Sequence, residues 1–260
     1  MESITIANLI YQYYIPYESF DADIGGAEMP DWAKAGSRSA KAYADIVGAE
    51  YMLSHDRYFG HLDPRLDSLR IIHDPYFDKF DKILVLDLDM LISTRHNIFK
   101  VFSRDVGMVH ESGIHQHPSV SKWLHKVMDP PLEDRGIKAY GRKLFGKHWR
   151  FPRSVTAPSD PYRYLNGGLQ LWSKNGRIKA RENFTSIDDY VLHTRYTEQM
   201  YINLQLSQPM FEVTELEPYW NRLPYQWQGK HDGKINHFLA RTKFTMPELE
   251  HTELSVWQPI

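Results

Sequence analysis

The sequence predicts an α/β domain, and two observations carry that prediction. Short apolar runs alternate with segments in which apolar residues have helical spacing, and no internal repeat or low-complexity tract interrupts the alternation. The apolar run 82–86 then ends abruptly in Asp87 and Asp89, as expected of a strand that is buried on both faces and carries carboxylates at its end. We therefore expect a mostly parallel central sheet flanked by helices.

The first 112 residues are expected to form the first part of the domain. The elements we predict there, in order, are a strand over 4–10, a loop through Asp21–Gly26, a helix over 32–47 that Gly48 ends, a strand over 50–54, a helix over 64–80 that Pro75 kinks or divides, the strand before Asp87, and a strand over 106–109.

Residues 113–160 break this pattern with a Pro-, His- and Arg-containing sequence. We interpret them as an insertion with a helix near 119–128, after which regular structure resumes at Tyr164 and residues 161–260 complete a single domain. The segment 146–153 mixes cations with aromatics, which suits either a sugar-binding surface or an ordinary loop with aromatic anchors. We expect the histidines at positions 110, 115 and 117 to form a surface cluster and not a second metal site.

Composition excludes several classes of function. With 260 residues, 42% of them hydrophobic and 13% aromatic, the chain can bury a large core. A formal net charge of -2 argues against a general nucleic-acid binder, and no apolar stretch approaches the roughly 18 residues of a membrane span. The amino terminus lacks the features of a signal peptide, so we expect a cytoplasmic protein. Because the chain has no cysteine, any metal must be held by oxygen and imidazole.

Asp87 and Asp89 are the first candidate ligands. In open α/β sheets ligands bind at the carboxyl edge of the strands, and residues i and i+2 of an extended chain point the same way. Two carboxylates there favour a hard divalent ion such as Mg²⁺ or Mn²⁺. The alternative is that the triplet lies in a solvated turn.

Asn166, Gly167 and Gly168 lie within an apolar stretch, where paired glycines allow the backbone to approach a ligand closely. A β-bulge or a hairpin is the alternative. Further along, Glu198 and Gln199 follow Thr197 at the start of a predicted helix over 198–204. The helix dipole alone also accounts for an acidic residue there.

His237 and Lys243 are the last candidates. An imidazole completes a two-carboxylate metal site, and a lysine six residues later can neutralise a phosphate. Each residue also has a simpler interpretation when taken singly: His237 as a core histidine and Lys243 as a surface lysine.

The four motifs occur in the order seen in metal-dependent GT-A glycosyltransferases, and the chain resembles the glycogenin-like and bacterial galactosyltransferase-like group called family 8. The resemblance covers Arg70 to Phe244 and includes the segment 217–221. It implies a GT-A fold, Mn²⁺ or Mg²⁺ as cofactor, a nucleotide sugar with UDP as the expected nucleotide, and a glycan, glycoconjugate or protein acceptor. It also implies transfer of a hexose or related sugar with retention of configuration. Within the single domain, it assigns binding of the donor nucleotide to residues 1–112, the acceptor side to the insertion 113–160, and sugar binding and completion of the metal site to residues 161–260.

For the metal and the diphosphate, the resemblance implies three protein ligands, Asp87, Asp89 and His237. Lys243 would contact the distal phosphate of the donor.

For the donor sugar, the resemblance implies a pocket lined by Asn166 and the backbone of Gly167 and Gly168. Gln199, beside Glu198, would lie beneath the anomeric carbon. Arg70, seventeen residues before the first aspartate, would also touch the sugar, with a helix-surface arginine as the alternative.

The chain departs from the family pattern at the first strand, which lacks the usual base-holding segment. We expect Asn8 or Tyr11 to substitute for it. Two other classes of function stay open: a catalytically silent carbohydrate- or nucleotide-binding module, and a metal-dependent nucleotidyltransferase. The glycine-rich phosphate loops typical of the latter are not evident in the sequence.

Overall fold

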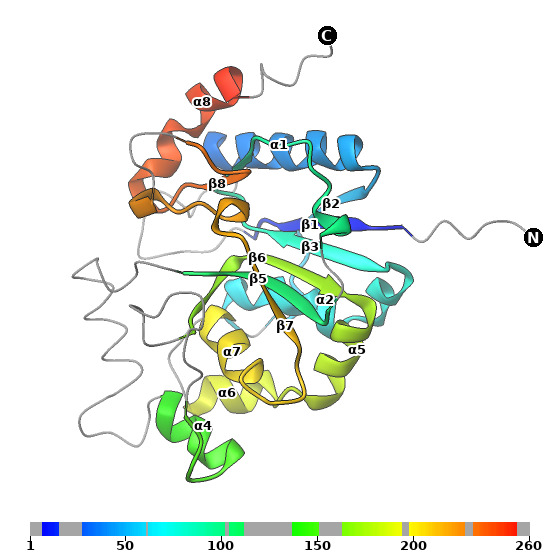
Figure 1. Cartoon of the computed structure of the whole chain (residues 1–260), viewed down its shortest axis with the longest axis vertical. Coiled ribbons are helices and arrows are strands. Elements are labelled where there is room, and N and C mark those ends of the chain that lie inside the picture. The colour runs from blue at the N-terminus through cyan, green and yellow to red at the C-terminus, as the bar shows by residue number, and fades with distance from the viewer. Residues whose placement is uncertain are drawn as a thin grey trace, which may run out of the picture.

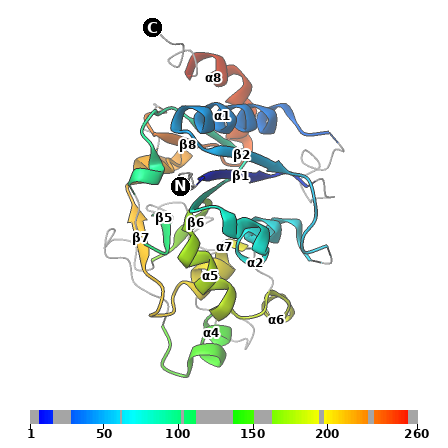
Figure 2. The ribbon, with the colours of Figure 1, turned by 90° about the vertical axis from the view of Figure 1, so that its right-hand side faces the viewer.

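The computed structural model describes residues 7–15, 28–60, 62–101, 104–111, 137–150, 163–193, 198–226 and 231–253. A central sheet runs through the molecule, with α1 (Asp31–Val47) and α8 (Met246–Glu253) on one side of it and α2 (Arg70–His73), α5 (Lys174–Asn183) and α7 (Glu198–Gln205) on the other (Figures 1 and 2). This arrangement confirms the predicted α/β architecture.

The central sheet has six strands in the order β2-β1-β3-β6-β5-β7. The pairs β1–β2, β1–β3 and β5–β7 are parallel, and β6 runs antiparallel to both of its neighbours. The sheet is therefore mostly parallel, as predicted. The strand bounds are β1 Leu9–Tyr13, β2 Glu50–Ser54, β3 Lys82–Leu86, β5 Val106–His110, β6 Leu165–Ser173 and β7 Val213–Leu216.

Strand β3 is buried on both faces, as its sequence predicts. Ile83 and Val85 pack into one hydrophobic core, whereas Leu84 and Leu86 pack into the core on the opposite face. Alternation of side chains along an extended strand divides the apolar run between the two layers.

A small second sheet pairs β4 (Met90–Ile92) antiparallel with β8 (Ile235–His237). The chain passes from β3 to β4 through the turn that contains both aspartates. The turn lies against α1 at Gly36, where a Cβ atom would meet the carbonyl oxygen of Leu88 at 1.8 Å. Only a residue without a side chain permits this approach.

The predicted helix over 32–47 and its stop are confirmed: α1 ends at Val47, and Gly48 follows with φ 69°, the left-handed conformation that glycine adopts without strain. The predicted helix over 64–80 instead forms a 3₁₀ segment Pro64–Leu69, the single turn α2, and a 3₁₀ segment Pro75–Lys79. Pro64 and Pro75 each begin a segment, because proline suits a first turn and cannot continue a preceding one.

The first strand begins later than predicted, at Leu9, and extends to Tyr13. Its register with β2 and β3 starts at Leu9, and aromatic residues suit the extended conformation. Residues 4–6, the loop 21–26 and the predicted helix near 119–128 lie outside the described residues.

Further helices lie below the sheet in Figure 1, and short 3₁₀ segments connect other elements. Within the insertion the structure has a helix that the sequence did not predict, α4 (Ile137–Phe145), and α6 (Ile187–His193) follows α5. Short 3₁₀ segments occupy Ile98–Lys100, Pro218–Trp220, Pro224–Gln226 and Ala240–Thr245. In the part of the chain that the structure describes, no helix combines the length and apolar character needed to cross a bilayer.

Candidate metal centre and donor cleft

Asp87, Asp89 and His237 come together at the junction of the two sheets. Asp87 follows β3, Asp89 precedes β4, and His237 ends β8, which pairs with β4. One ligand atom from each side chain lies within 4.8 Å of the other two. Nε2 of His237 is 3.1 Å from Oδ1 of Asp89 and 3.8 Å from Oδ2 of Asp87. The predicted metal ligands therefore converge although 148 positions separate Asp89 from His237 (237 − 89).

The three ligand side chains fit a divalent metal. His237 is buried, and its Nδ1 is 3.1 Å from Oδ1 of Asn221, which leaves Nε2 facing the carboxylates without a hydrogen-bond partner among the described residues. A Cβ atom on Gly168 would meet Cε1 of His237 at 2.6 Å and Oδ2 of Asp87 at 2.7 Å. Two carboxylate oxygens and one neutral imidazole nitrogen suit Mn²⁺ or Mg²⁺, and only glycine leaves the ligands room to converge.

The charges in this cluster alter its proton affinities. Burial raises the pKa of Asp87 to about 6, with a further increase from Asp89 and a partial offset from His237. Burial lowers the pKa of His237, but the neighbouring Asp89 and Asp87 outweigh that effect, so the net shift is upward. Two carboxylates held this close repel each other, and a bound cation relieves that repulsion.

A cleft of about 220 Å³ opens from the metal ligands. Glu198 and Lys243 line it together with both aspartates, and Trp32 forms part of its wall. The Lys243 ammonium lies 4.6 Å from the centre of the Trp32 ring. The cleft thus combines an acidic end with a cation over an aromatic surface.

Glu198 faces the cleft and has an unusual proton affinity. Its Oε2 atom is buried without a hydrogen-bond partner among the described residues. Burial raises the pKa of Glu198 to about 7, and the charge of Asp87 adds to the effect.

Asn166, Gly167 and Gln199 meet behind the metal ligands. Nδ2 of Asn166 donates to Oε2 of Glu111 at 3.3 Å, and its Oδ1 accepts from the backbone N–H of Gly168 at 2.9 Å. Oε1 of Gln199 accepts from the N–H of Gly167 at 2.8 Å, and its Nε2 donates to Glu111 at 3.0 Å. Gln199 is therefore held at both ends of its amide, while its neighbour in α7 faces the cleft.

The glycine pair does not form a hairpin. It lies inside β6, opposite a register irregularity between Met108 and His110 of β5, which agrees with the bulge alternative.

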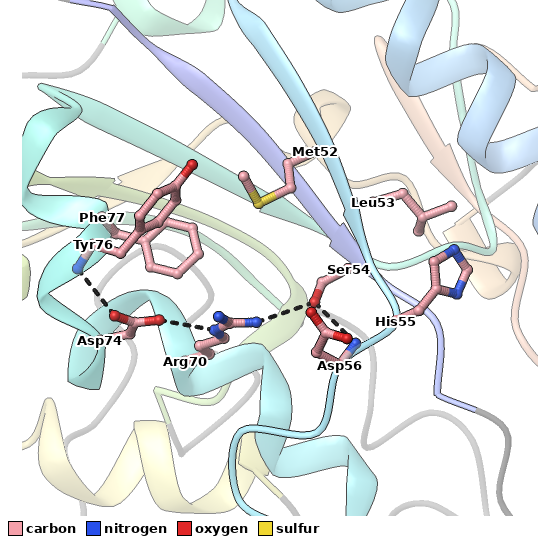
Figure 3. A pocket seen from close by; sticks show the side chains of 9 residues that line it. All are labelled: Met52, Leu53, Ser54, His55, Asp56, Arg70, Asp74, Tyr76 and Phe77. Carbon is pink, nitrogen blue, oxygen red and sulfur yellow. Dashed lines mark hydrogen bonds and ion pairs between the residues drawn. The ribbon is translucent and has the colours of Figure 1, made fainter.

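Arg70 lies in a different pocket, of about 440 Å³ (Figure 3). Its guanidinium donates to Asp74 at 3.0 Å and to Ser54 at 3.4 Å, and none of the residues lining the donor cleft lines this pocket. Although this pocket is the larger, it lacks the acidic cluster. The structure thus does not bring Arg70 to the metal centre. The cleft is instead lined by Arg65, which pairs with Asp63 at 2.6 Å.

Asn8 and Tyr11 are also placed away from the cleft. Asn8 precedes β1, whose register puts it level with Lys82, roughly 16 Å along the strand direction from Asp87. Tyr11 is fully buried and packs edge-on against Phe77. Neither residue lines the cleft, which lies at the opposite end of β1 from Asn8.

Two tyrosines that follow the predicted strand 4–10 line the cleft instead. Tyr13 and Tyr14 lie at the carboxyl end of β1 and line the cleft. The hydroxyl of Tyr14 donates to the carbonyl of Glu28 at 3.0 Å, which holds its ring in place.

The interpretations of the histidine cluster and of the segment 146–153 have different outcomes. His110 is buried at the end of β5, so the expected surface cluster is wrong for this member, and the other two histidines lie outside the described residues. Trp149 donates its indole N–H to Ser207 at 3.1 Å and packs against Phe145. These contacts favour the aromatic-anchor interpretation for the described part of 146–153.

Sequence reasoning missed Glu111, Trp32 and any role for Asn221. Glu111 follows an apolar run in the same way as Asp87 follows β3, and that signal was available. No local sequence pattern marks Asn221 or Trp32 as a site residue, because only the fold brings them to the site.

Comparison with known proteins decides the fold. No protein-family model matches the chain, and no curated protein matches it. A solved glycosyltransferase involved in glycosylation of the major capsid of PBCV-1 superposes with a TM-score of 0.52 at 11% identity, over 95% of this chain and 99% of that chain. The chain has a GT-A glycosyltransferase fold.

A second structure with this GT-A fold is similar over almost the whole chain. The apo form of the bifunctional glycosyltransferase WbbM gives a TM-score of 0.55 at 10% identity, over 98% of this chain and 52% of that chain. At such low sequence identity, a structural match establishes the fold but not the activity. The activity depends on the chemistry of the site.

Proposed function

We propose that this protein is a metal-dependent glycosyltransferase. It transfers a hexose or related sugar from a nucleoside diphosphate donor, with uridine as the expected nucleoside, to a hydroxyl group of a glycan, glycoconjugate or protein. The observation that carries the proposal is the convergence of Asp87, Asp89 and His237. The two aspartates line a cleft together with Lys243 and Glu198.

The cleft supports a nucleoside diphosphate as donor. Lys243 is buried beside Trp32, so its ammonium offers a positive charge to a phosphate with little competition from water. The indole N–H of Trp32 is buried and has no partner among the described residues. Tyr13 and Tyr14 provide aromatic surface for a base.

Breaking a sugar–phosphate bond builds negative charge on the departing diphosphate and positive charge on the anomeric carbon. A bound Mn²⁺ or Mg²⁺ would supply Lewis-acid stabilisation to the diphosphate. Asp87, Asp89 and His237 would hold the ion, and Lys243 in the same cleft would stabilise the same charge.

The sugar is expected to lie near Asn166, Gly167 and Gly168, with the carboxylate of Glu198 stabilising positive charge at the anomeric carbon. Gln199 is expected to hold the backbone of this pocket through Gly167. We expect retention of anomeric configuration, as the family resemblance implies, and the configuration of the product is measurable by NMR.

The experiment incubates the purified protein with a panel of nucleotide sugars and Mn²⁺, and measures release of nucleoside diphosphate with and without EDTA. We expect release from one donor, abolished by EDTA. Asp89→Asn should reduce release by at least about 100-fold, because one of the three protein ligands loses its charge.

Asp105→Asn is the matched control. This aspartate is buried and pairs with Lys179 outside the cleft, so donor cleavage should be retained. Nucleotide binding without turnover across acceptors would indicate a silent binding module. Release of a nucleoside monophosphate or of pyrophosphate would contradict the proposal and indicate nucleotidyl transfer.

A further inference from the structure

We infer that Glu111 and Asn221 are positioning residues that orient the imidazole of His237, with its Nε2 lone pair toward the metal. This inference rests on the proposed metal-dependent function. It adds a continuous hydrogen-bond relay behind the three ligands.

The relay runs from a carboxylate to the imidazole through two amides. Oε2 of Glu111 accepts from Nδ2 of Asn166, and Oδ1 of Asn166 accepts from Nδ2 of Asn221 at 2.8 Å. Oδ1 of Asn221 is then 3.1 Å from Nδ1 of His237. The four residues come from the ends of β5 and β8, from β6, and from the segment after the 3₁₀ turn 218–220.

The polarity of the relay follows from its carboxylate end. An ionised carboxylate only accepts hydrogen bonds, so it orients the NH₂ group of Asn166 toward itself and the carbonyl oxygen away. That oxygen faces the NH₂ group of Asn221, whose own oxygen must then face the imidazole. Nδ1 of His237 is thereby fixed as a donor, and in the neutral imidazole Nε2 is left as the ligand atom.

Burial shields the hydrogen bonds of the relay from solvent. Glu111 is 7% exposed, Asn221 0% and His237 2%. Water is therefore not available to replace a lost partner, and reversing one amide would set two acceptors or two donors against each other. Hydrogen bonds in such surroundings are strong and expensive to break.

A second anchor holds the start of the relay. Nε2 of Gln199 donates to the same Oε2 atom of Glu111 at 3.0 Å, and Oε1 of Gln199 accepts from the N–H of Gly167. The carboxylate is thus held by α7 as well as β6, which fixes its position relative to the metal ligands.

The test measures Mn²⁺ affinity by titration calorimetry in the presence of UDP, which has no sugar, so that an effect on sugar binding cannot contribute. Asn221→Ala removes the partner of Nδ1 and should weaken Mn²⁺ binding by about 10- to 100-fold. Asn221→Asp keeps an acceptor for Nδ1 but loses the NH₂ group that donates to Asn166, so it should weaken Mn²⁺ binding less than Asn221→Ala does. A smaller loss in the aspartate variant separates orientation of His237 from general damage to the fold.

Glu111→Leu tests the far end of the relay. It leaves the amides of Asn166 and Gln199 without their common acceptor, and it should weaken Mn²⁺ binding less than Asn221→Ala does. In the Mg²⁺–UDP complex, wild type should show an exchange-protected Nδ1–H resonance of His237 by NMR. Glu111→Leu should speed its exchange, and Asn221→Ala should abolish its protection.

Gln205→Ala is the matched control, because this amide is equally buried on α7 but bonds to Thr185, away from the metal. It should leave Mn²⁺ affinity and the imidazole resonance unchanged. Failure of wild type to bind Mn²⁺ with UDP would overturn the proposed function itself. If wild type binds and Asn221→Ala binds equally well, the relay is refuted, and an unchanged affinity and resonance in Glu111→Leu would remove Glu111 from it.

Discussion

At the scale of single residues, Glu198 shows how position changes the chemistry of an ordinary carboxylate. It occupies the first turn of α7, where an acidic side chain needs no special explanation. Burial beside Asp87 nevertheless raises its pKa to about 7, with smaller effects from Arg65 and Asp63. In metal-free protein this side chain therefore titrates near neutral pH.

We predict that Glu198→Gln changes the pH dependence of stability in metal-free protein. A carboxyl whose pKa is raised on folding stabilises the native state fully below the unfolded value of 4.5, and this contribution is lost as pH rises through about 7. The free energy of unfolding of wild type, relative to the variant, should fall by about 2 kcal/mol between pH 4.5 and 7.5. Urea unfolding at several pH values measures it.

The control for this prediction is Glu182→Gln, on the exposed face of α5. Its difference from wild type should change little over the same range. A pH-independent difference between wild type and Glu198→Gln would show that Glu198 titrates normally.

At the scale of secondary structure elements, Arg177 of α5 joins the helical layer to the sheet. The side chain is fully buried and donates to the carbonyl groups of Trp172 at 3.2 Å, Phe77 at 3.1 Å and Phe80 at 2.6 Å. It thereby connects the end of β6 to the 3₁₀ segment that leads into β3. Burial lowers its pKa to about 10, so it stays charged at neutral pH.

We predict that Arg177→Met lowers the free energy of unfolding by about 3 kcal/mol. The substitution keeps much of the apolar volume but leaves three carbonyl groups without a charged donor. The measurement is urea unfolding at pH 7.

Arg181→Met on the same helix is the matched control. Arg181 forms a two-point ion pair with Asp78 and donates to the carbonyl of Ile72, but it is partly exposed to solvent. Its replacement should cost about 1 kcal/mol. Equal losses in the two variants would contradict a special role for Arg177.

At the scale of the whole molecule, the metal centre joins the central sheet to the small sheet. Asp87 extends β3, whereas His237 ends β8, and Phe238 donates its backbone N–H to the carbonyl of Asp89 at 2.7 Å. A ligand bound here connects chain segments that are distant in sequence. Binding should therefore stabilise the fold as a unit.

We predict that Mn²⁺ and UDP together raise the thermal midpoint of unfolding by about 5–10 °C at 100 times the dissociation constant, because both bind the native state. Mn²⁺ alone should give a much smaller shift, since the phosphates supply the missing ligands. His237→Ala should lose the joint effect. Differential scanning calorimetry measures these shifts, and equally tight Mn²⁺ binding without UDP would contradict the shared site.

The sequence correctly predicted those helices and strands that are marked by a pattern in their own residues. The apolar run 82–86, the helical spacing over 32–47 and the residue Gly48 each have a local physical cause, and each is confirmed. The helix expected over 64–80 failed where prolines and a short loop favour 3₁₀ turns. The single-domain organisation remains a prediction.

The sequence by itself determined the α/β pattern, the buried strand and the carboxylates that follow it, because burial and strand geometry act on neighbouring residues. Only the tertiary structure brought His237 within 3.1 Å of Asp89. It also moved Arg70 and Tyr11 away from the cleft and brought in Glu111 and Asn221 behind the metal ligands. Such contacts depend on strand order and on the packing of distant segments, which local patterns in a chain do not encode separately.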